Sequence, residues 1–369
     1  MKKELKIFTF ILASFLLFYF MPMESAVFTG AILSGFQLMN EYAREHVLTC
    51  LVPAFFIAGA IAVFIKKDSV IKYLGQDAKK YISYGVASVS GAILAVCSCT
   101  ILPLFAGIRK RGAGLGPAIT FLFSGPAINI AAMTLTISVL GPNIGFARII
   151  SAITISILVG ITMAVIFREK VDKADFLFSK NENSKISKAT MATFFILMVG
   201  FLIINDFSLT TLQKYSIMGV LLIGIISVVI LKFEKSVTQK WLSETWGFSK
   251  KLIPLLFIGV FIAGFIMPLL PQTLIEKIVG TNSITGNLTA SIFGAFMYFS
   301  TLTEVPVLQA LMAKGMHNGP ALALLLAGPS LSLPNMLVIK SVLGDKKTAV
   351  YISLVIIYST IAGLIFGGI

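Results

Sequence analysis

The chain alternates long apolar stretches with short clusters of lysine and arginine, and this alternation constrains the fold more than any other feature. Only 12% of the 369 residues are charged and 57% are hydrophobic, whereas a soluble domain has about 25% charged residues. A chain so poor in charge cannot cover a soluble surface, which excludes a soluble enzyme. Because a membrane-spanning helix needs about 20 apolar residues, the apolar content is enough for roughly ten crossings. The sequence therefore predicts an all-α polytopic membrane protein.

The basic clusters assign connecting segments to one side of the membrane. The net charge of +14 is carried by short runs between apolar segments, a positive-inside pattern rather than a nucleic-acid surface. The pattern places the N-terminus in the cytoplasm, together with the runs 66–67, 109–111, 168–188, 232–251 and 346–347. Trp241 and Trp246 in the fourth run predict an interfacial helix. We expect about nine crossings, over residues 7–21, 46–65, 117–140, 146–167, 192–204, 215–231, 252–270, 321–343 and 349–366.

Two further apolar segments are predicted to be re-entrant or broken helices. Segment 81–108 runs between two cytoplasmic clusters, so a hairpin that breaks near Cys97 to Pro103 returns the chain to the side that it left. Irregular backbone at membrane depth is tolerated where protein or a cavity surrounds it. Segment 287–313 is also too long for one crossing and is interrupted at Pro306.

The sequence contains an internal repeat. A shift of 203 residues aligns Pro103 with Pro306, and Gly125–Pro126 with Gly328–Pro329, without gaps. Compositional bias aligns leucines, but it does not align prolines and glycines in this way. An odd number of predicted crossings separates the two copies, which gives them opposite orientations. Inverted repeats with broken helices are common in secondary transporters, which bind substrate at the repeat interface; the alternative is a duplication retained only for packing.

The repeat divides the chain into four parts. We expect an N-terminal helix and external segment in residues 1–45 and the first transmembrane repeat in 46–167. The linking region, 168–250, contains two cytoplasmic loops and two transmembrane helices. The second, inverted repeat occupies 251–369.

The first candidate site residues are Cys97, Ser98 and Cys99, which precede Pro103. An alternating thiol pair on an unwound segment would direct both sulfurs into one cavity. Thiolates are soft ligands that suit soft metal ions and, by the same softness, trivalent metalloids. The alternative is that each cysteine is a small buried hydrophobic residue. The odd number of cysteines, three, does not indicate a disulfide framework.

Glu304 is the second candidate because an acid at membrane depth costs about 2.5 to 3.5 kcal/mol on insertion scales. We expect it to be a proton-coupling residue that the pseudo-symmetry brings toward the cysteine pair. The alternative is a carboxyl group satisfied by a backbone or hydroxyl partner.

The third group of candidates surrounds the two matched Gly-Pro pairs. Proline breaks a preceding helix and suits the first turn of a new one. Each pair is therefore predicted to create a half-helix N-terminus with positive dipole character; the alternative is a pair of kinks for helix packing. The candidate substrate-binding residues are Ser124, Gly125, Pro126 and Asn129 in the first copy, and Gly328, Pro329, Ser330, Ser332 and Asn335 in the second.

These motifs together resemble the predicted-permease family that includes the ArsP-type organoarsenical exporters. The resemblance rests on Cys97-Ser-Cys-Thr-Ile-Leu-Pro103, Gly112-Ala-Gly-Leu-Gly-Pro117 and Gly125-Pro-Ala-Ile-Asn129, with Glu304-Val-Pro306 in the second copy. It covers the chain from about Pro53 onward. The resemblance implies a multi-pass permease of the plasma membrane and, for the ArsP branch, efflux of trivalent organoarsenicals with arsenical resistance.

The sequence thus predicts a secondary transporter that moves a small thiol-reactive solute by alternating access, with proton coupling. A passive channel built from paired half-helices and a membrane-embedded thiol redox protein are the alternatives. No Gly-x4-Gly-Lys-Ser/Thr phosphate loop is present, so ATP hydrolysis is unsupported. We expect no enzyme activity, no cofactor, no metal site and no nucleic-acid partner. The predicted partners are the small-molecule substrate and membrane lipid; the sequence specifies no oligomeric state.

Overall fold

The computed structural model describes residues 22–64, 73–75, 78–94, 98–169, 187–204, 210–269, 278–298 and 304–369, with isolated positions between 8 and 20. Within these residues the chain is helical and has no strand. The all-α prediction is therefore confirmed. The predicted crossing 7–21 falls almost entirely outside the described residues, and so does Cys97.

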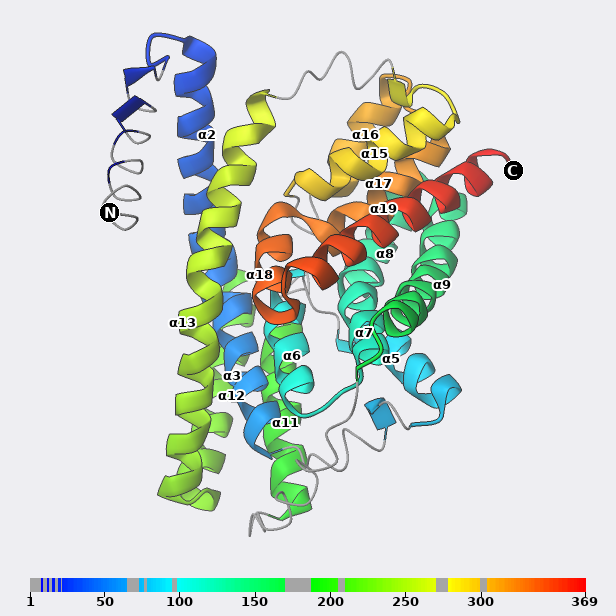
Figure 1. Ribbon diagram of the computed structural model, residues 1–369. Coiled ribbons are helices and arrows are strands. Elements are labelled where there is room, and N and C mark those ends of the chain that lie inside the picture. The colour runs from blue at the N-terminus through cyan, green and yellow to red at the C-terminus, as the bar shows by residue number, and fades with distance from the viewer. Residues whose placement is uncertain are drawn as a thin grey trace.

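The helices form two groups, with α6 (Ser98–Lys110) and α18 (Leu333–Leu343) between them (Figure 1). The first group contains α2 (Ala26–Tyr42), α3 (Val52–Phe64), α11 (Lys188–Ile203), α12 (Thr211–Lys232) and α13 (Lys235–Ile266). The second group contains α5 (Lys80–Leu94), α7 (Leu115–Ala127), α8 (Ile130–Leu140), α9 (Pro142–Ile166), α15 (Ile284–Phe296), α16 (Glu304–Ala313), α17 (Asn318–Leu331) and α19 (Asp345–Gly367). The short π-helix η1 (Ala43–Leu51) connects α2 to α3, and the 3₁₀ turn η3 (Met267–Leu269) follows α13. Helices from both halves of the sequence are thus mixed within the second group.

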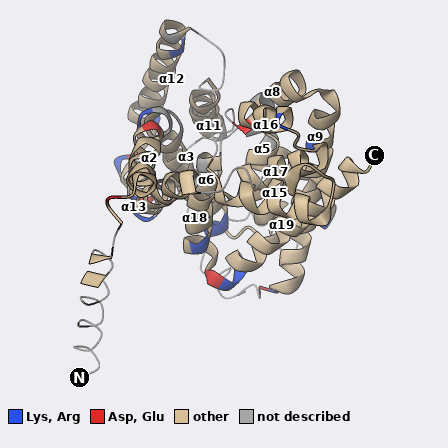
Figure 2. Cartoon of the chain, turned by 90° about the horizontal axis from the view of Figure 1, so that it is seen from above, with Lys and Arg blue, Asp and Glu red and all other residues tan. Residues whose placement is uncertain are grey.

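Several helices are long and apolar enough to span a bilayer. Four helices meet this condition, namely α9, α12, α13 and α19, and the bent pairs α7–α8 and α17–α18 add up to two spans. Charged residues are few along most of the helices (Figure 2). The described residues therefore contain four to six candidate crossings, and the predicted number of nine, which also counts shorter helices and residues 7–21, stays a prediction.

The region from residue 232 to residue 270 differs from the sequence prediction of a loop followed by a crossing. Within it, Lys235–Ile266 form one helix of 32 residues, α13, and the 3₁₀ turn η3 follows. Trp241 is only 5% exposed, and its Nε1 donates a hydrogen bond to the carbonyl of Phe56 at 2.8 Å. The indole of Trp241 is therefore satisfied inside the protein between α13 and α3, and the interfacial position of this segment stays a prediction. Trp246 is exposed.

The predicted external segment before residue 46 contains a helix, α2, that runs along α13 (Figure 1). A Cβ atom added to Gly35 would lie 2.9 Å from the ring of Phe261, and one added to Gly264 would lie 2.9 Å from the carbonyl oxygen of Ser34. Small residues allow such close helix contacts in membrane proteins.

The backbone repeats at the same spacing as the sequence. Helices α7, α8 and α9 begin at residues 115, 130 and 142, and α17, α18 and α19 begin at 318, 333 and 345. The turns before these helices also match: Gly112 and Gly141 have φ of 92° and 95°, and Gly315 and Gly344 have φ of 103° and 82°. Only glycine adopts this left-handed conformation without steric cost. The aligned glycines therefore mark the same turns in both halves.

Each half contains a close helix crossing made by two glycines. A Cβ atom on Gly160 of α9 would lie 2.7 Å from the carbonyl oxygen of Gly116 in α7. At the matched crossing, a Cβ atom on Gly363 of α19 would lie 2.6 Å from the carbonyl oxygen of Gly319 in α17. The two crossings thus depend on the absence of side chains at these positions.

Helices α9 and α19, which occupy matched positions in the two halves, lie side by side and antiparallel. Glu169, just beyond the end of α9, forms an ion pair of 2.7 Å with Lys347 in the first turn of α19. At the opposite ends, Ile150 of α9 and Phe366 of α19 line one apolar fissure of about 300 Å³. The end of one helix therefore lies beside the start of the other.

We expect Gly160→Ala and Gly363→Ala each to destabilise the protein by about 1–3 kcal/mol, because overpacking forces closely packed backbones apart. The measurement is the thermal unfolding midpoint of the detergent-solubilised protein. Gly219→Ala is the control, since a Cβ atom there meets nothing within 4 Å. Equal midpoints for Gly160→Ala and Gly219→Ala would contradict the close crossing of α7 and α9.

Candidate functional site

The first helix break separates α7 from α8 and begins later than the Gly-Pro pair. Gly125 and Pro126 belong to the last turn of α7, which ends at Ala127. Pro126 therefore does not open the new half-helix, contrary to the prediction; it removes a helical N–H near the end of the old one. The N-terminus of α8 is capped by Asn129, whose Oδ1 accepts a hydrogen bond from the N–H of Ala132 at 3.3 Å.

The second helix break separates α17 from α18. Gly328 and Pro329 again lie within the preceding helix, and the new helix carries Pro334 in its first turn. Ser332 joins the two helices with φ of 22°, and it is the one non-glycine residue with positive φ in the described chain. Strained backbone of this kind persists only where surrounding structure imposes it and is concentrated at functional sites.

The polar side chains at the two breaks differ in how they are satisfied. At the first break, the Oγ of Ser124 donates a hydrogen bond to the carbonyl of Ala87 in α5 at 3.0 Å. At the second break, the hydroxyls of Ser330 and Ser332 are buried and have no hydrogen-bond partner among the described residues. Asn335 is also buried, one turn further along α18. Buried hydroxyls normally have partners, so the second break is the better candidate for contact with a polar solute.

The glycines at the breaks permit close helix contacts. A Cβ atom on Gly125 would lie 2.7 Å from the Cδ1 atom of Ile101 in α6. A Cβ atom on Gly294 of α15 would lie 3.2 Å from the backbone nitrogen of Gly328. Both contacts are close approaches between helices, and a role for Gly125 and Gly328 in substrate binding stays a prediction.

The predicted cysteine site is only partly described. Helix α6 begins at Ser98, which is buried, and Cys99 follows within the helix; Cys97 and the side chain of Cys99 lie outside the described residues. Pro103 lies inside α6, and Pro306 lies in the first turn of α16. In the second element, Met297 and Tyr298 are not helical, so the chain leaves the helical conformation before Pro306 and not at it. No group of three metal-binding side chains occurs in the described part of the chain.

Glu304 is buried at the start of α16 and forms an ion pair that the sequence analysis did not predict. Its Oε1 lies 2.5 Å from Nη2 of Arg148 in α9, and the exposed fractions of the two side chains are 1% and 0%. Nη1 of Arg148 donates a further hydrogen bond to the Oγ1 of Thr136 in α8 at 2.8 Å. The contact joins the second broken element to two helices of the first half.

The signal that would have identified Arg148 was present in the sequence. Arg148 is the single charged residue of the predicted crossing 146–167, and an ionisable residue inside a membrane segment is a functional candidate by default. At the matched position of the second half stands Tyr351, whose hydroxyl donates to the carbonyl of Ser330 at 3.4 Å. Ile101 stands at the position matched to Glu304, so the ion pair occurs at one of two equivalent places.

We expect Arg148→Met to lower stability by about 3–5 kcal/mol, because it leaves the Glu304 carboxylate buried without a partner. The double variant Arg148→Met with Glu304→Gln leaves no unpaired charge and is expected to unfold at a higher temperature than Arg148→Met alone. Thermal unfolding of the detergent-solubilised wild type, Arg148→Met, Glu304→Gln and the double variant tests this. A double variant with the summed loss of both single variants would show that the two side chains act independently.

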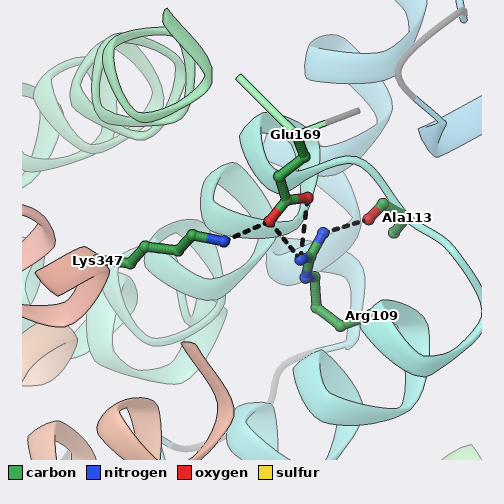
Figure 3. Close-up of polar contacts among 4 residues, drawn as sticks. All are labelled: Arg109, Ala113, Glu169 and Lys347. Atoms are coloured by element: carbon green, nitrogen blue, oxygen red, sulfur yellow. Dashed lines mark hydrogen bonds and ion pairs between the residues drawn. The ribbon is translucent and has the colours of Figure 1, made fainter. Parts of the chain in front are cut away.

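A second ion cluster, made of Glu169, Arg109 and Lys347, lies at one end of the helices (Figure 3). Glu169 lies 2.8 Å from Arg109, in the last turn of α6, and 2.7 Å from Lys347. Arg109 also donates to the carbonyl of Ala113 at 2.6 Å, and nearby in the sequence Lys110 pairs with Glu244 of α13. These ion pairs thus connect the four runs 109–111, 168–188, 232–251 and 346–347, which the basic clusters assign to the cytoplasmic side.

The Glu169 cluster shifts the pKa of the carboxyl group. Burial alone raises this pKa, but the hydrogen bonds and charges of Lys347 and Arg109 outweigh burial and hold the pKa below its ordinary value of 4.5. The folded protein therefore binds the proton of Glu169 less readily than the unfolded chain does. The ionised carboxylate adds stability above the unfolded pKa, and this stability is lost as the pH falls through the folded pKa.

We accordingly expect the thermal unfolding midpoint to fall as the pH is lowered below about 4.5, with a smaller fall in Glu169→Gln, which has no carboxyl to protonate. Glu24→Gln is the matched control, because it removes an exposed glutamate. Identical pH profiles for the wild type and Glu169→Gln would show that the cluster does not contribute to acid sensitivity.

Comparison with known proteins places these features in a family. A family model described as a predicted permease matches residues 32–368. The UPF0718 protein MJ0584 of Methanocaldococcus jannaschii is 48% identical over 342 residues, which cover 89% of this chain and 93% of that protein. The UPF0718 protein YraQ of Escherichia coli K12 is 21% identical over 349 residues, covering 93% and 84% of the two chains.

A shorter similarity concerns a Streptococcus mutans protein whose name assigns it provisionally to a two-component membrane permease complex. It is 30% identical over 119 residues, which cover 32% of this chain and 39% of that protein. No solved structure matches this chain.

Proposed function

This chain belongs to the predicted permease family, and from that membership we propose that it is a secondary transporter working by alternating access. It is a multi-pass membrane protein of a permease family. The plasma membrane, a cytoplasmic N-terminus and export of the solute are the further parts of the proposal. They rest on the positive-inside pattern and on the family resemblance.

The observation that carries the proposal is the pair of bent helices at matched positions. Helices α7–α8 bend by 48° and α17–α18 by 49°. The antiparallel contact of the matched helices α9 and α19 supports copies of opposite orientation, which is the architecture in which transporters bind substrate between broken helices. In addition, α6 packs on α18 and α16 packs on α8, so each short helix of one half contacts the helix that follows the break in the other half.

The proposed substrate is a trivalent organoarsenical or another small thiol-reactive solute. Cys97 and Cys99 would bind the soft arsenic atom; each arsenic–sulfur bond that forms releases one water molecule from a thiol hydrogen and a hydroxyl group on arsenic. The unpartnered hydroxyls of Ser330 and Ser332 support a polar contact with the same solute at the second break. The remaining predicted residues of the breaks act by shaping the helices.

Proton coupling would operate through Glu304 and Arg148. A proton that binds the Glu304 carboxylate removes its charge and with it the electrostatic attraction to Arg148. Because this ion pair joins α16 to α9, its loss weakens one connection between the two halves. Protonation and helix movement are linked in this proposal, and the closest alternative, a passive channel, needs no such link.

The test is uptake of methylarsenite by everted membrane vesicles with and without a proton gradient. We expect gradient-driven, saturable accumulation in the wild type, and a loss of at least tenfold in Cys97→Ser with Cys99→Ser. Glu304→Gln is expected to keep downhill flux and lose accumulation, because a neutral amide cannot exchange a proton.

Cys50→Ser is the matched control, because it removes a thiol outside the candidate site. Flux that never exceeds equilibration in the wild type would favour the channel. Accumulation unaffected by the double cysteine variant would exclude the thiols as the binding groups, and no methylarsenite flux at all by the folded protein would exclude this substrate.

A further inference from the structure

A cavity of about 670 Å³ lies beside the Glu169 cluster, between the start of α5, the start of α7 and the end of α9. Its size falls within the range of ligand pockets in proteins. Polar groups contribute a substantial part of its lining, among them the side chains of Ser83, Tyr84 and Glu169. The cavity lies at the start of α7, whereas the first helix break lies at the end of that helix, so the cavity is not part of the solute site proposed above.

The N-terminus of α7 opens into this cavity without a cap. Its N-cap residue is Gly114, which has no side chain, and no side-chain hydrogen bond caps the helix. The first two helical N–H groups belong to Leu115 and Gly116, both of which line the cavity, and neither has an acceptor within the described residues. Uncapped N–H groups and the helix dipole together favour a bound anion.

A second observation points to a ligand at the same place. Ser83 of α5 is 1% exposed, it lines the cavity, and its Oγ has no hydrogen-bond partner in the described part of the protein. A buried hydroxyl without a partner is unusual. A ligand oxygen in the cavity would supply the missing acceptor.

The N-terminus of α17, the matched helix of the second half, is capped by a side chain of the protein itself. His317 stands at the position of Gly114, and its Nδ1 accepts a hydrogen bond from the N–H of Gly319 at 3.3 Å. Asn287 stands at the position of Tyr84, and its Nδ2 donates a hydrogen bond to Oδ1 of Asn282 at 2.9 Å. This Oδ1 lies close to the start of the helix, because it is 2.4 Å from the place of a Cβ atom on Gly319. The two halves thus share a backbone, but only the first leaves its helix terminus open to a ligand.

The charges around the cavity also favour an anion. Lys80 and Arg168 line it, and neither forms an ion pair with any described residue. The carboxylate of Glu169 is neutralised by Arg109 and Lys347. We propose that this cavity is a binding site for a phosphate-type oxyanion, held by the N–H groups of Leu115 and Gly116 and by the hydroxyl of Ser83.

The oxyanion can come from a soluble phosphate compound or from an anionic lipid headgroup, and two measurements separate these sources. Calorimetric titration of the detergent-solubilised full chain with inorganic phosphate tests the first source. Native mass spectrometry after release from vesicles of phosphatidylglycerol or phosphatidylcholine tests the second. We expect binding in one of the two measurements, and about tenfold weaker binding in Ser83→Ala, as for loss of one hydrogen bond to a charged group.

Two further variants make the test specific. Lys80→Gln with Arg168→Gln removes both exposed cations of the lining and is expected to weaken binding without affecting folding, so it replaces Ser83→Ala if that protein is unstable. Lys79→Gln is the matched control, because Lys79 is exposed beside the site but does not line it. Absence of both phosphate binding and selective phosphatidylglycerol retention, or equal binding by wild type and all variants, would overturn the proposal.

Discussion

The buried ion pair between Arg148 and Glu304 determines how the two halves of this protein fit together. The two residues are 156 positions apart, and neither side chain reaches solvent. Separation of the pair inside an apolar environment would leave two unpaired charges, which is far more costly than separation of two apolar side chains. Helix α16 is therefore bound to α9, and through Thr136 to α8, more specifically than packing alone would require. The position of the second broken element follows from this contact.

Local signals in the sequence predicted the helical membrane class, the repeat and the approximate positions of the helix breaks. Glycine at Gly112 and Gly315, and proline near each break, act through backbone geometry that does not depend on distant residues. Features that depend on contacts between distant parts of the chain could not be predicted from these local signals. The burial of Trp241, the packing of α2 on α13 and the partner of Glu304 all depend on contacts across many residues. The exact start of each half-helix was also missed, because Pro126 and Pro329 end one helix rather than start the next.

The two halves share their backbone and differ in their polar side chains. Arg148 corresponds to Tyr351, Glu304 to Ile101 and Gly114 to His317, although the helices that carry them begin at matched positions. The repeated backbone provides two similar frameworks, and the side chains give each one a different chemistry. Among the described residues, the ion pair of Arg148 and Glu304 and the uncapped N-terminus of α7 each occur at only one of the two matched places. The matched helices α7 to α9 and α17 to α19 therefore share their spacing along the chain and differ in the charges that they carry.

The ends of α9 and α19 are connected by unlike forces. At one end Glu169 binds cations from α6 and α19, and at the other end apolar side chains such as Ile150 and Phe366 line an open fissure. Charges attract over a longer range than the contacts between methyl groups act. The two helices are therefore held by charged contacts near Glu169 and by apolar contacts at the fissure. Between the two ends, the hydroxyls of Thr162 and Tyr358 form a further hydrogen bond of 3.0 Å, so the polar contacts between α9 and α19 are not confined to the charged end.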